Sequence, residues 1–330
     1  MLESILKKPT AAELYMRLRR GRAGNIIVLF VVVQALAILC GIVFPGNFRY
    51  LDQGNIQLML KAIPSLAITA LGVNLLMIAG EFDLSVGATF TFTALVMAKI
   101  FNAHMPLGIA VLAALALGAA IGFLNGLIVV KTNVPSFIVT LGSMWFWRGI
   151  ILIISQAVTE SFYPSAFFTQ LFTLNVGPMQ IQFLWALLIA MLCWFFLERH
   201  KVGNFFFGVG GNRNAASALG VNVGRVKIIA FVITGFLTAF AGIMSTVRIN
   251  SISPIQGEGL ELQAIAACVI GGTALMGGRG TILGAFLGAA LMFTIQDILL
   301  LLQAPGFYLR MFVGIVIVIA AALNEMLKKE

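Results

Sequence analysis

Charged side chains are scarce in this chain. Asp, Glu, Lys and Arg make up only 10% of its 330 residues, hydrophobic residues make up 60%, and the mean hydropathy is +1.03. A soluble domain carries about 25% charged residues, so a chain of this composition cannot cover its surface in water. It is a polytopic membrane protein. Its apolar runs are continuous rather than alternating, which excludes a β-barrel and indicates an all-α fold.

Reactive and metal-binding side chains are also few. The three cysteines, Cys40, Cys193 and Cys268, each stand alone in an apolar run, so they indicate neither a disulfide nor a metal site. The two histidines, His104 and His200, lie at the ends of apolar runs without metal-ligand spacing. A G-x-S-x-G nucleophile motif is missing as well. The sequence therefore predicts no catalytic residue, no metal and no enzymatic activity.

A G-x-x-x-x-G-K-[ST] phosphate-binding loop does not occur in the sequence. The chain cannot hydrolyse ATP alone and is expected to hold no cofactor, so ATP-derived energy would have to arrive through contact with another protein. The net charge of +9 is spread over loops and termini in short groups. This spacing favours membrane topology and contact with anionic lipid, and it argues against a nucleic-acid partner.

Long apolar runs dominate what is present. A membrane-spanning helix needs about 20 residues to cross roughly 30 Å of hydrocarbon. By that measure the sequence predicts about ten spans within one transmembrane domain, residues 25–324. They cover residues 25–45, 57–79, 85–103, 106–130, 136–155, 181–197, 227–247, 261–277, 281–302 and 307–324.

The cations set the predicted orientation. With the amino terminus in the cytoplasm, most Lys and Arg residues fall in cytoplasmic segments, and the longest outside loop, 156–180, has none. An even number of spans then returns the tail, 325–330, to the cytoplasm. Residues 1–24 are predicted to form an amphipathic helix on the membrane surface, begun by a capping box of Thr10 and Glu13. A signal peptide is the alternative, but the apolar run that follows is too long for one.

A polar loop, 198–227, separates the sixth and seventh predicted spans. Asn212 is a suitable N-cap and Gly220 a suitable left-handed stop, so a short helix is predicted over 212–219. The loop is rich in cations and is expected in the cytoplasm. From this segment alone, a docking element and a plain connector are equally open.

Ionisable residues in or beside the spans are costly unless they are paired or wet. Glu81 and Asp83 lie between the second and third spans, and Asp83 is placed to cap the third. Others either snorkel to the interface or line a polar cavity: Lys61, Arg148, Asp297 and Arg310. Glycines near Thr273 also permit a broken helix, a device that transporters use along substrate paths.

Three segments carry a family resemblance. They are GEFDLSVGA at 80–88, GGNRNAASALGVNVGRVKII at 210–229 and ELQAIAACVIGGTALMGGRGTILG at 261–284. In their order and spacing they resemble the ribose-permease family of bacterial sugar-type ABC importers, which is related to branched-chain amino acid permeases. The resemblance extends over nearly the whole chain beyond the amino-terminal helix.

The resemblance implies a permease subunit of the bacterial inner membrane. Its expected partners are a second permease subunit, a cytoplasmic ATP-binding subunit that holds ATP and Mg²⁺, and an extracytoplasmic solute-binding protein. The predicted short helix would be the coupling helix that contacts the ATPase. Asn214 departs from the E-A-A-x-x-x-G pattern of importer permeases, where a glutamate is usual. The residues assigned to coupling are Asn212, Arg213, Asn214, Ala215, Ala216, Leu219 and Gly220.

The implied function is import of a small polar solute, such as ribose or a related monosaccharide, by alternating access. A permease for a nucleoside or a branched-chain amino acid is the alternative. A secondary transporter is a further one, although Asp297 is the only acid well inside a predicted span. The residues predicted to line the pathway are Asn74, Glu81, Asp83, Ser85, Gln263 and Thr273, and interhelical hydrogen bonding is their alternative role.

Overall fold

The computed structural model describes residues 24–46, 48–177 and 179–326. The predicted amino-terminal helix, 1–24, lies almost wholly outside the described residues, as does most of the predicted tail. The rest is mostly helical, as expected from the apolar runs.

Each predicted span overlaps one helix. Within the described residues, seven helices are long and apolar enough to cross a membrane: α2 (Gly24–Val43), α3 (Gln53–Ile78), α5 (Leu107–Thr132), α6 (Ser136–Ser155), α8 (Ile181–Arg199), α11 (Val223–Ile249) and α13 (Ile282–Leu301). Three others carry shorter apolar stretches: α4 (Val86–Asn102), α12 (Leu260–Ile270) and α14 (Phe307–Met326). A multi-span helical fold is therefore confirmed. The count of ten and the placement of both termini in the cytoplasm stay predictions.

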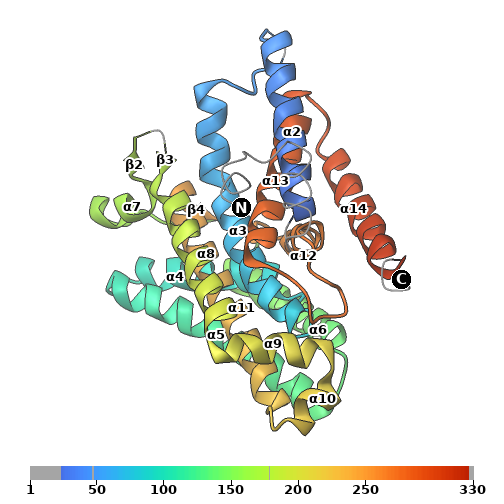
Figure 1. Cartoon of the computed structure of the whole chain (residues 1–330). Helices are drawn as coiled ribbons and strands as arrows, with labels where there is room; N and C mark the ends of the chain where they lie inside the picture. The colour runs from blue at the N-terminus through green and yellow to red at the C-terminus, as the bar shows by residue number, and fades with distance from the viewer. Residues whose placement is uncertain (1–23, 47, 178, 327–330) are drawn as a thin grey trace, which may run out of the picture.

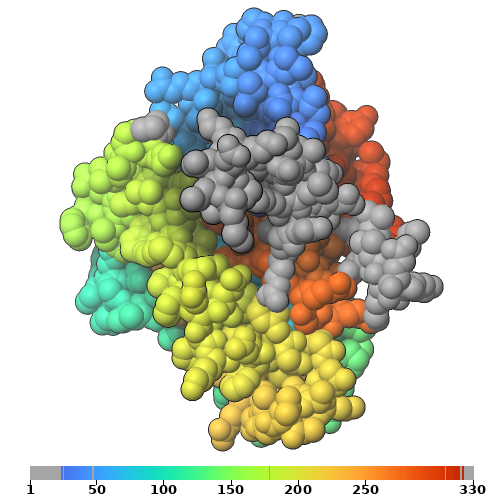
Figure 2. All heavy atoms as spheres, in the orientation of Figure 1, coloured from blue at the N-terminus to red at the C-terminus, as the bar shows by residue number. Residues whose placement is uncertain are grey.

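One end of the bundle carries two further helices, α9 (Lys201–Gly211) and α10 (Arg213–Ala218), and is called the α10 end (Figure 1). The turn after α3 and the turn after α12 meet there, because the N–H of Gly278 donates to the carbonyl of Ile78 (2.9 Å). Gly210 of α9 packs directly on both turns. In Figure 2 the yellow surface of this segment lies at the bottom of the view.

The opposite end is built from the long loop 156–180 and the segment after α11. Strand β1 (Glu160–Ser161) pairs antiparallel with β4 (Ser251–Ile252), and β2 (Asn175–Val176) pairs with β3 (Met179–Gln180) next to α7 (Ala166–Thr173). The Glu160 carboxylate accepts hydrogen bonds from Lys99 (2.6 Å) and Asn102 (2.7 Å) of α4, which pins the loop to the bundle. These short elements carry no signal in the sequence pattern.

The core lies along α3, α11 and α13. Of their apolar stretches, 61%, 67% and 61% are buried, against 17% in α2 and 11% in α6, which are peripheral. Small residues allow the central helices to approach closely, since packing rather than the hydrophobic effect holds transmembrane helices together. Gly118 and Gly122 of α5 lie against the backbone of α11 at Gly235 and Phe231.

The chain is irregular on both sides of α12, in the predicted connection before it and within the predicted span after it. Residues 253–259 are not helical, and α12 has only 11 residues, roughly 16 Å at 1.5 Å per residue. The predicted span 261–277 is therefore too long. The helix ends at Ile270 because Gly271 and Gly272 follow, the latter with φ of 88°, and the chain then turns through residues 271–281.

We expect Gly122→Ala to lower the stability of the bundle by about 1–3 kcal/mol, because the added Cβ would collide with the carbonyl oxygen of Phe231. Gly142→Ala is the matched control, since nothing lies within 4 Å of a Cβ at that position of α6. Thermal unfolding of both variants in detergent measures the difference. Equal midpoints would contradict the tight α5–α11 contact.

Candidate coupling surface and solute pathway

Helix α10 forms as its sequence predicts. The side-chain oxygen of Asn212 accepts from the N–H of Ala215 (3.0 Å), and Gly220 adopts φ of 82° after the last turn. Ala216 is buried, which fixes the helix on the protein, while Leu219 is 84% exposed. The helix therefore packs on the bundle through Ala216 and presents Leu219 at its surface. That a partner docks there stays a prediction.

Helix α9 was missed by the sequence reasoning, which predicted a loop. The chain breaks at His200, whose ring nitrogen accepts from the N–H of Val202 (3.3 Å), and a new helix starts there. The many glycines of this segment argue against a helix by propensity. Two of them are required by packing instead: Gly203 lies against the backbone of Leu197, and Gly210 against that of Ile78.

Glu81 links the coupling helix to the transmembrane helices. Its carboxylate is buried, with 4% of the residue exposed, and it pairs with Arg213 of α10 (2.9 Å) and Lys227 of α11 (2.5 Å). Burial of a charge is tolerated because both opposite charges lie within contact distance. We call these three residues the Glu81 clasp. Glu81 was predicted to line the pathway, and the structure places it at the α10 end.

Asp83 and Ser85 lie in the same turn and are buried. Asp83 accepts from the N–H (2.7 Å) and hydroxyl (2.6 Å) of Ser85, and the amide of Asn125 donates to the Ser85 hydroxyl (2.9 Å). The Asp83 carboxylate thus bonds to Ser85, in the turn that precedes α4. As a cap of α4 it was expected to lie near the first amides of that helix. Burial raises the pKa of the Asp83 carboxyl, against the lowering effect of the bonds from Ser85 and Asn125.

Asn74 and Thr273 bond to one another across the core. The Thr273 hydroxyl donates to the side-chain oxygen of Asn74 (2.5 Å), and the Asn74 amide donates to the carbonyl of Thr281 (3.3 Å). Asn74 is 0% and Thr273 2% exposed. These bonds join α3 to the segment between α12 and α13, so both side chains contact protein. That Asn74 and Thr273 take part in solute passage stays a prediction.

Gln263, the sixth predicted pathway residue, lies in the first turn of α12 and is partly exposed. A polar cluster that the sequence reasoning did not assemble surrounds this helix start. Arg148 of α6 donates to the carbonyl of Pro254 (3.3 Å) and lies close enough to Glu258 and Glu261 for their charges to stabilise its guanidinium. One carboxylate oxygen of Glu261 is buried and has no hydrogen-bond partner within the described ranges.

The helix start is held against α4. The N–H of Gly257 donates to the hydroxyl of Thr91 (3.0 Å), and any side chain at Gly257 or Gly87 would collide with the facing segment. Arg148 lies well inside α6, away from both ends of that helix, and with Glu258 and Glu261 it forms what we call the Arg148 cluster. Irregular backbone at such depth is tolerated only where it is buried or lines a cavity.

The other ionisable candidates are dispersed. Asp297 is buried in α13 and accepts from the amide of Asn55 (2.9 Å), and Arg310 is exposed on α14. Lys61 borders a cavity at the end opposite α10. In the described part of the chain, no three or more His, Cys, Asp or Glu side chains are arranged to hold a metal ion.

Comparison of the sequence with known proteins places the chain in a family. The family model "Branched-chain amino acid transport system / permease component" matches residues 55–321. The autoinducer 2 import system permease protein LsrC of Salmonella choleraesuis is 34% identical over 284 residues, which cover 86% of this chain and 82% of that protein. The ribose import permease protein RbsC of Haemophilus influenzae is 31% identical over 296 residues, covering 89% and 92%. No solved structure matches.

The chain therefore belongs to this family of importer permeases. The resemblance to sugar-type ABC importer permeases is confirmed, and the protein is a multi-pass protein of the inner membrane.

Removing the negative charge of Glu81 tests how much the clasp contributes to stability. We expect Glu81→Gln to lower stability by about 3 kcal/mol, because Lys227, whose side chain is 10% exposed, would keep a buried charge without its partner. Glu160→Gln removes the partner of Lys99, a pair whose lysine is 43% exposed, and should cost under about 1 kcal/mol. Thermal unfolding at neutral pH compares the two variants, and equal losses would contradict the clasp.

Proposed function

We propose that this chain is the membrane-spanning subunit of an ATP-driven importer, and that it moves a monosaccharide or a similar polyhydroxylated solute into the cell. The observation that carries the proposal is α10, a capped helix with an exposed apolar tip and a buried ionic link to the bundle. Such a helix has the shape that a permease needs to receive movement from a separate ATPase. Membership of the permease family supports the same conclusion.

The proposed assembly has four kinds of component. This subunit pairs with a second permease chain, a copy or a relative, in a lipid bilayer. A cytoplasmic ATP-binding subunit holds ATP and Mg²⁺ and docks on α10. A solute-binding protein delivers solute to the opposite end. The chain itself contributes no cofactor and performs no chemistry.

The Glu81 clasp supplies the proposed transmission. A displacement of α10 moves Arg213, and Glu81 joins Arg213 to Lys227 of α11 and to the turn between α3 and α4. The close backbone contacts of Gly210 with the turns after α3 and α12 make this end move as one body. Rigid movement at the α10 end then reaches α12, whose start carries the Arg148 cluster.

The Arg148 cluster is the proposed solute contact. Sugars are neutral and carry many hydroxyls, and Arg and Glu side chains provide donors and acceptors in fixed directions for them. The unpartnered oxygen of Glu261 is one such acceptor. A broken helix at mid-depth whose start faces the substrate is a recurring transporter device. Two relatives are named for ribose and autoinducer 2, which favours this solute class over a nucleoside or a branched-chain amino acid.

Disrupting the end of α10 tests the coupling. We expect Gly220→Pro to insert normally but to reduce solute-stimulated ATP hydrolysis in the assembled complex by about tenfold or more. Proline fixes φ near −65° and removes an N–H, whereas Gly220 has φ of 82° and donates to Ser217 (2.9 Å). Gly46→Pro, in an open turn at the opposite end, is the control. Full stimulation in Gly220→Pro would rule out α10 as the coupling element.

Removing a charge from the cluster tests the pathway. We expect Arg148→Gln to weaken solute uptake about 10–100-fold, the loss of one charge-assisted hydrogen bond of ~1.5–3 kcal/mol, while ATP hydrolysis without solute is retained. Arg310→Gln, which changes an exposed cation on α14, should transport normally. Uptake of ribose and leucine is measured side by side in vesicles. Unchanged uptake in Arg148→Gln would place the pathway elsewhere.

A further inference from the structure

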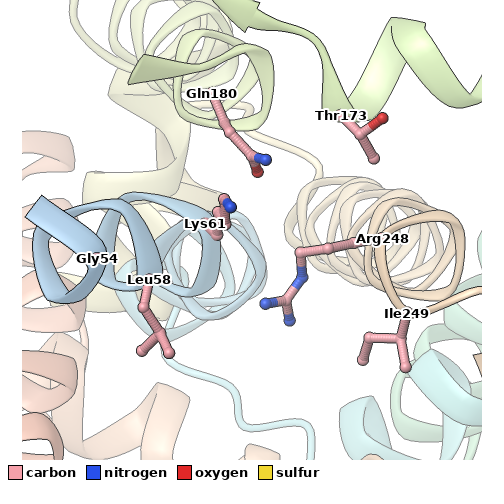
Figure 3. A pocket seen from close by; sticks show the side chains of 7 residues that line it. All are labelled: Gly54, Leu58, Lys61, Thr173, Gln180, Arg248 and Ile249. Atoms are coloured by element: carbon pink, nitrogen blue, oxygen red, sulfur yellow. The ribbon is translucent and has the colours of Figure 1, made fainter. Parts of the chain in front are cut away.

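A second polar site lies at the end of the bundle opposite α10. It is a cavity of about 410 Å³ between the first turns of α3, the last turn of α11 and the segment from α7 to β3 (Figure 3). Its size falls within the range of small-molecule sites, about 300–1,000 Å³. The side chains that line it are Leu58, Lys61, Thr173, Gln180, Arg248 and Ile249.

The cavity is cationic. Lys61 and Arg248 are the ionisable residues among its lining, and no acid is among them. Neither cation is within 4 Å of a carboxylate in the described part of the chain. Both residues are partly exposed, but the Nε of Arg248 is buried and has no hydrogen-bond partner among the described residues. Two cations that face one cavity repel each other. An anion between them would offset this repulsion and give the Nε of Arg248 an acceptor.

Gln180 adds an independent, neutral contact. The residue is 8% exposed, yet its side-chain oxygen has no hydrogen-bond partner in the part of the chain that the structure describes. In Figure 3 its amide group and the Lys61 ammonium point toward one another, and the Arg248 guanidinium reaches into the space beside them. A buried carboxamide oxygen in this position suits a hydroxyl donor.

We propose that this cavity binds an oxyanion that carries a neighbouring hydroxyl group. The carboxylate or phosphate lies between Lys61 and Arg248, and the hydroxyl donates to Gln180. A water-soluble hydroxy acid or phosphate ester presents this chemistry, and so does the headgroup of phosphatidylglycerol. The site is separate from α10 and from the Arg148 cluster, so it is independent of the importer proposal.

Thermal unfolding of the full chain in phosphatidylcholine nanodiscs tests the site. Gluconate and glycerol 3-phosphate are titrated at constant ionic strength against acetate, which has the carboxylate without hydroxyls, and against chloride. A parallel arm adds phosphatidylglycerol to the nanodisc lipid. We expect a hydroxylated anion or phosphatidylglycerol to raise the unfolding midpoint more than acetate or chloride does. A rise with the soluble anions identifies a solute site, and a rise with the lipid alone identifies a headgroup site.

Variants separate this cavity from general charge effects. We expect Lys61→Gln and Arg248→Gln to weaken the apparent affinity about tenfold, since each removes a charge-assisted bond. Gln180→Leu should reduce the preference for hydroxylated anions over acetate. Arg49→Gln, which changes an exposed cation near the same end, should bind as the unmodified chain does. Lys61→Gln is the deciding variant if Arg248→Gln does not fold. No anion-specific shift, or an undiminished shift in Lys61→Gln, would overturn the proposal.

Discussion

A single buried carboxylate holds together the part of the molecule on which the proposed function rests. Glu81 is buried between Arg213 and Lys227, and burial of its charge is tolerated because both cations pair with it. The three residues come from a turn, a short surface helix and a long central helix. Their pairing therefore makes the position of α10 a property of the bundle rather than of a flexible loop.

Close backbone packing at glycines constrains the α10 end as well. At the α10 end, Gly80, Gly210 and Gly278 bring three backbone segments into direct contact, which leaves no room for side chains that could slide past one another. Packed interfaces of this kind shift between discrete arrangements instead of deforming gradually. The ion pairs of Glu81 determine which segments lie together at this end, and the glycines allow their backbones to come into contact.

Local signals account for what the sequence predicted correctly. The helices follow from apolar length, and α10 follows from an N-cap and a stop that lie close together in the chain. The clasp and the Arg148 cluster join residues more than a hundred positions apart, and no local pattern encodes such contacts. Glu81 was singled out as costly, but its partners depend on packing that one sequence does not reveal. For α9, the low helix propensity of its glycines predicted a loop, but two of these glycines are required by tertiary contacts in a helix.

The two ends of α12 show the same limit. Apolar composition predicted a span over 261–277, and the glycines near Thr273 permitted a break in it, but composition does not give the position at which the backbone leaves the helix. Contacts with Thr91 and Gly87, far away in the chain, hold residues 253–259 in an irregular path. Only those contacts make an unwound segment tolerable inside the bundle.

The distribution of thiols gives the chain a useful experimental property. Cys40 is exposed near the end of α2, while Cys193 and Cys268 are buried. A thiol-reactive spin label or fluorophore should therefore modify the unaltered protein at one position. A second label at position 219, where Leu219 is 84% exposed, would lie at the other extremity of the bundle. The distance between the two probes would then report movement along the full height of the subunit during the transport cycle.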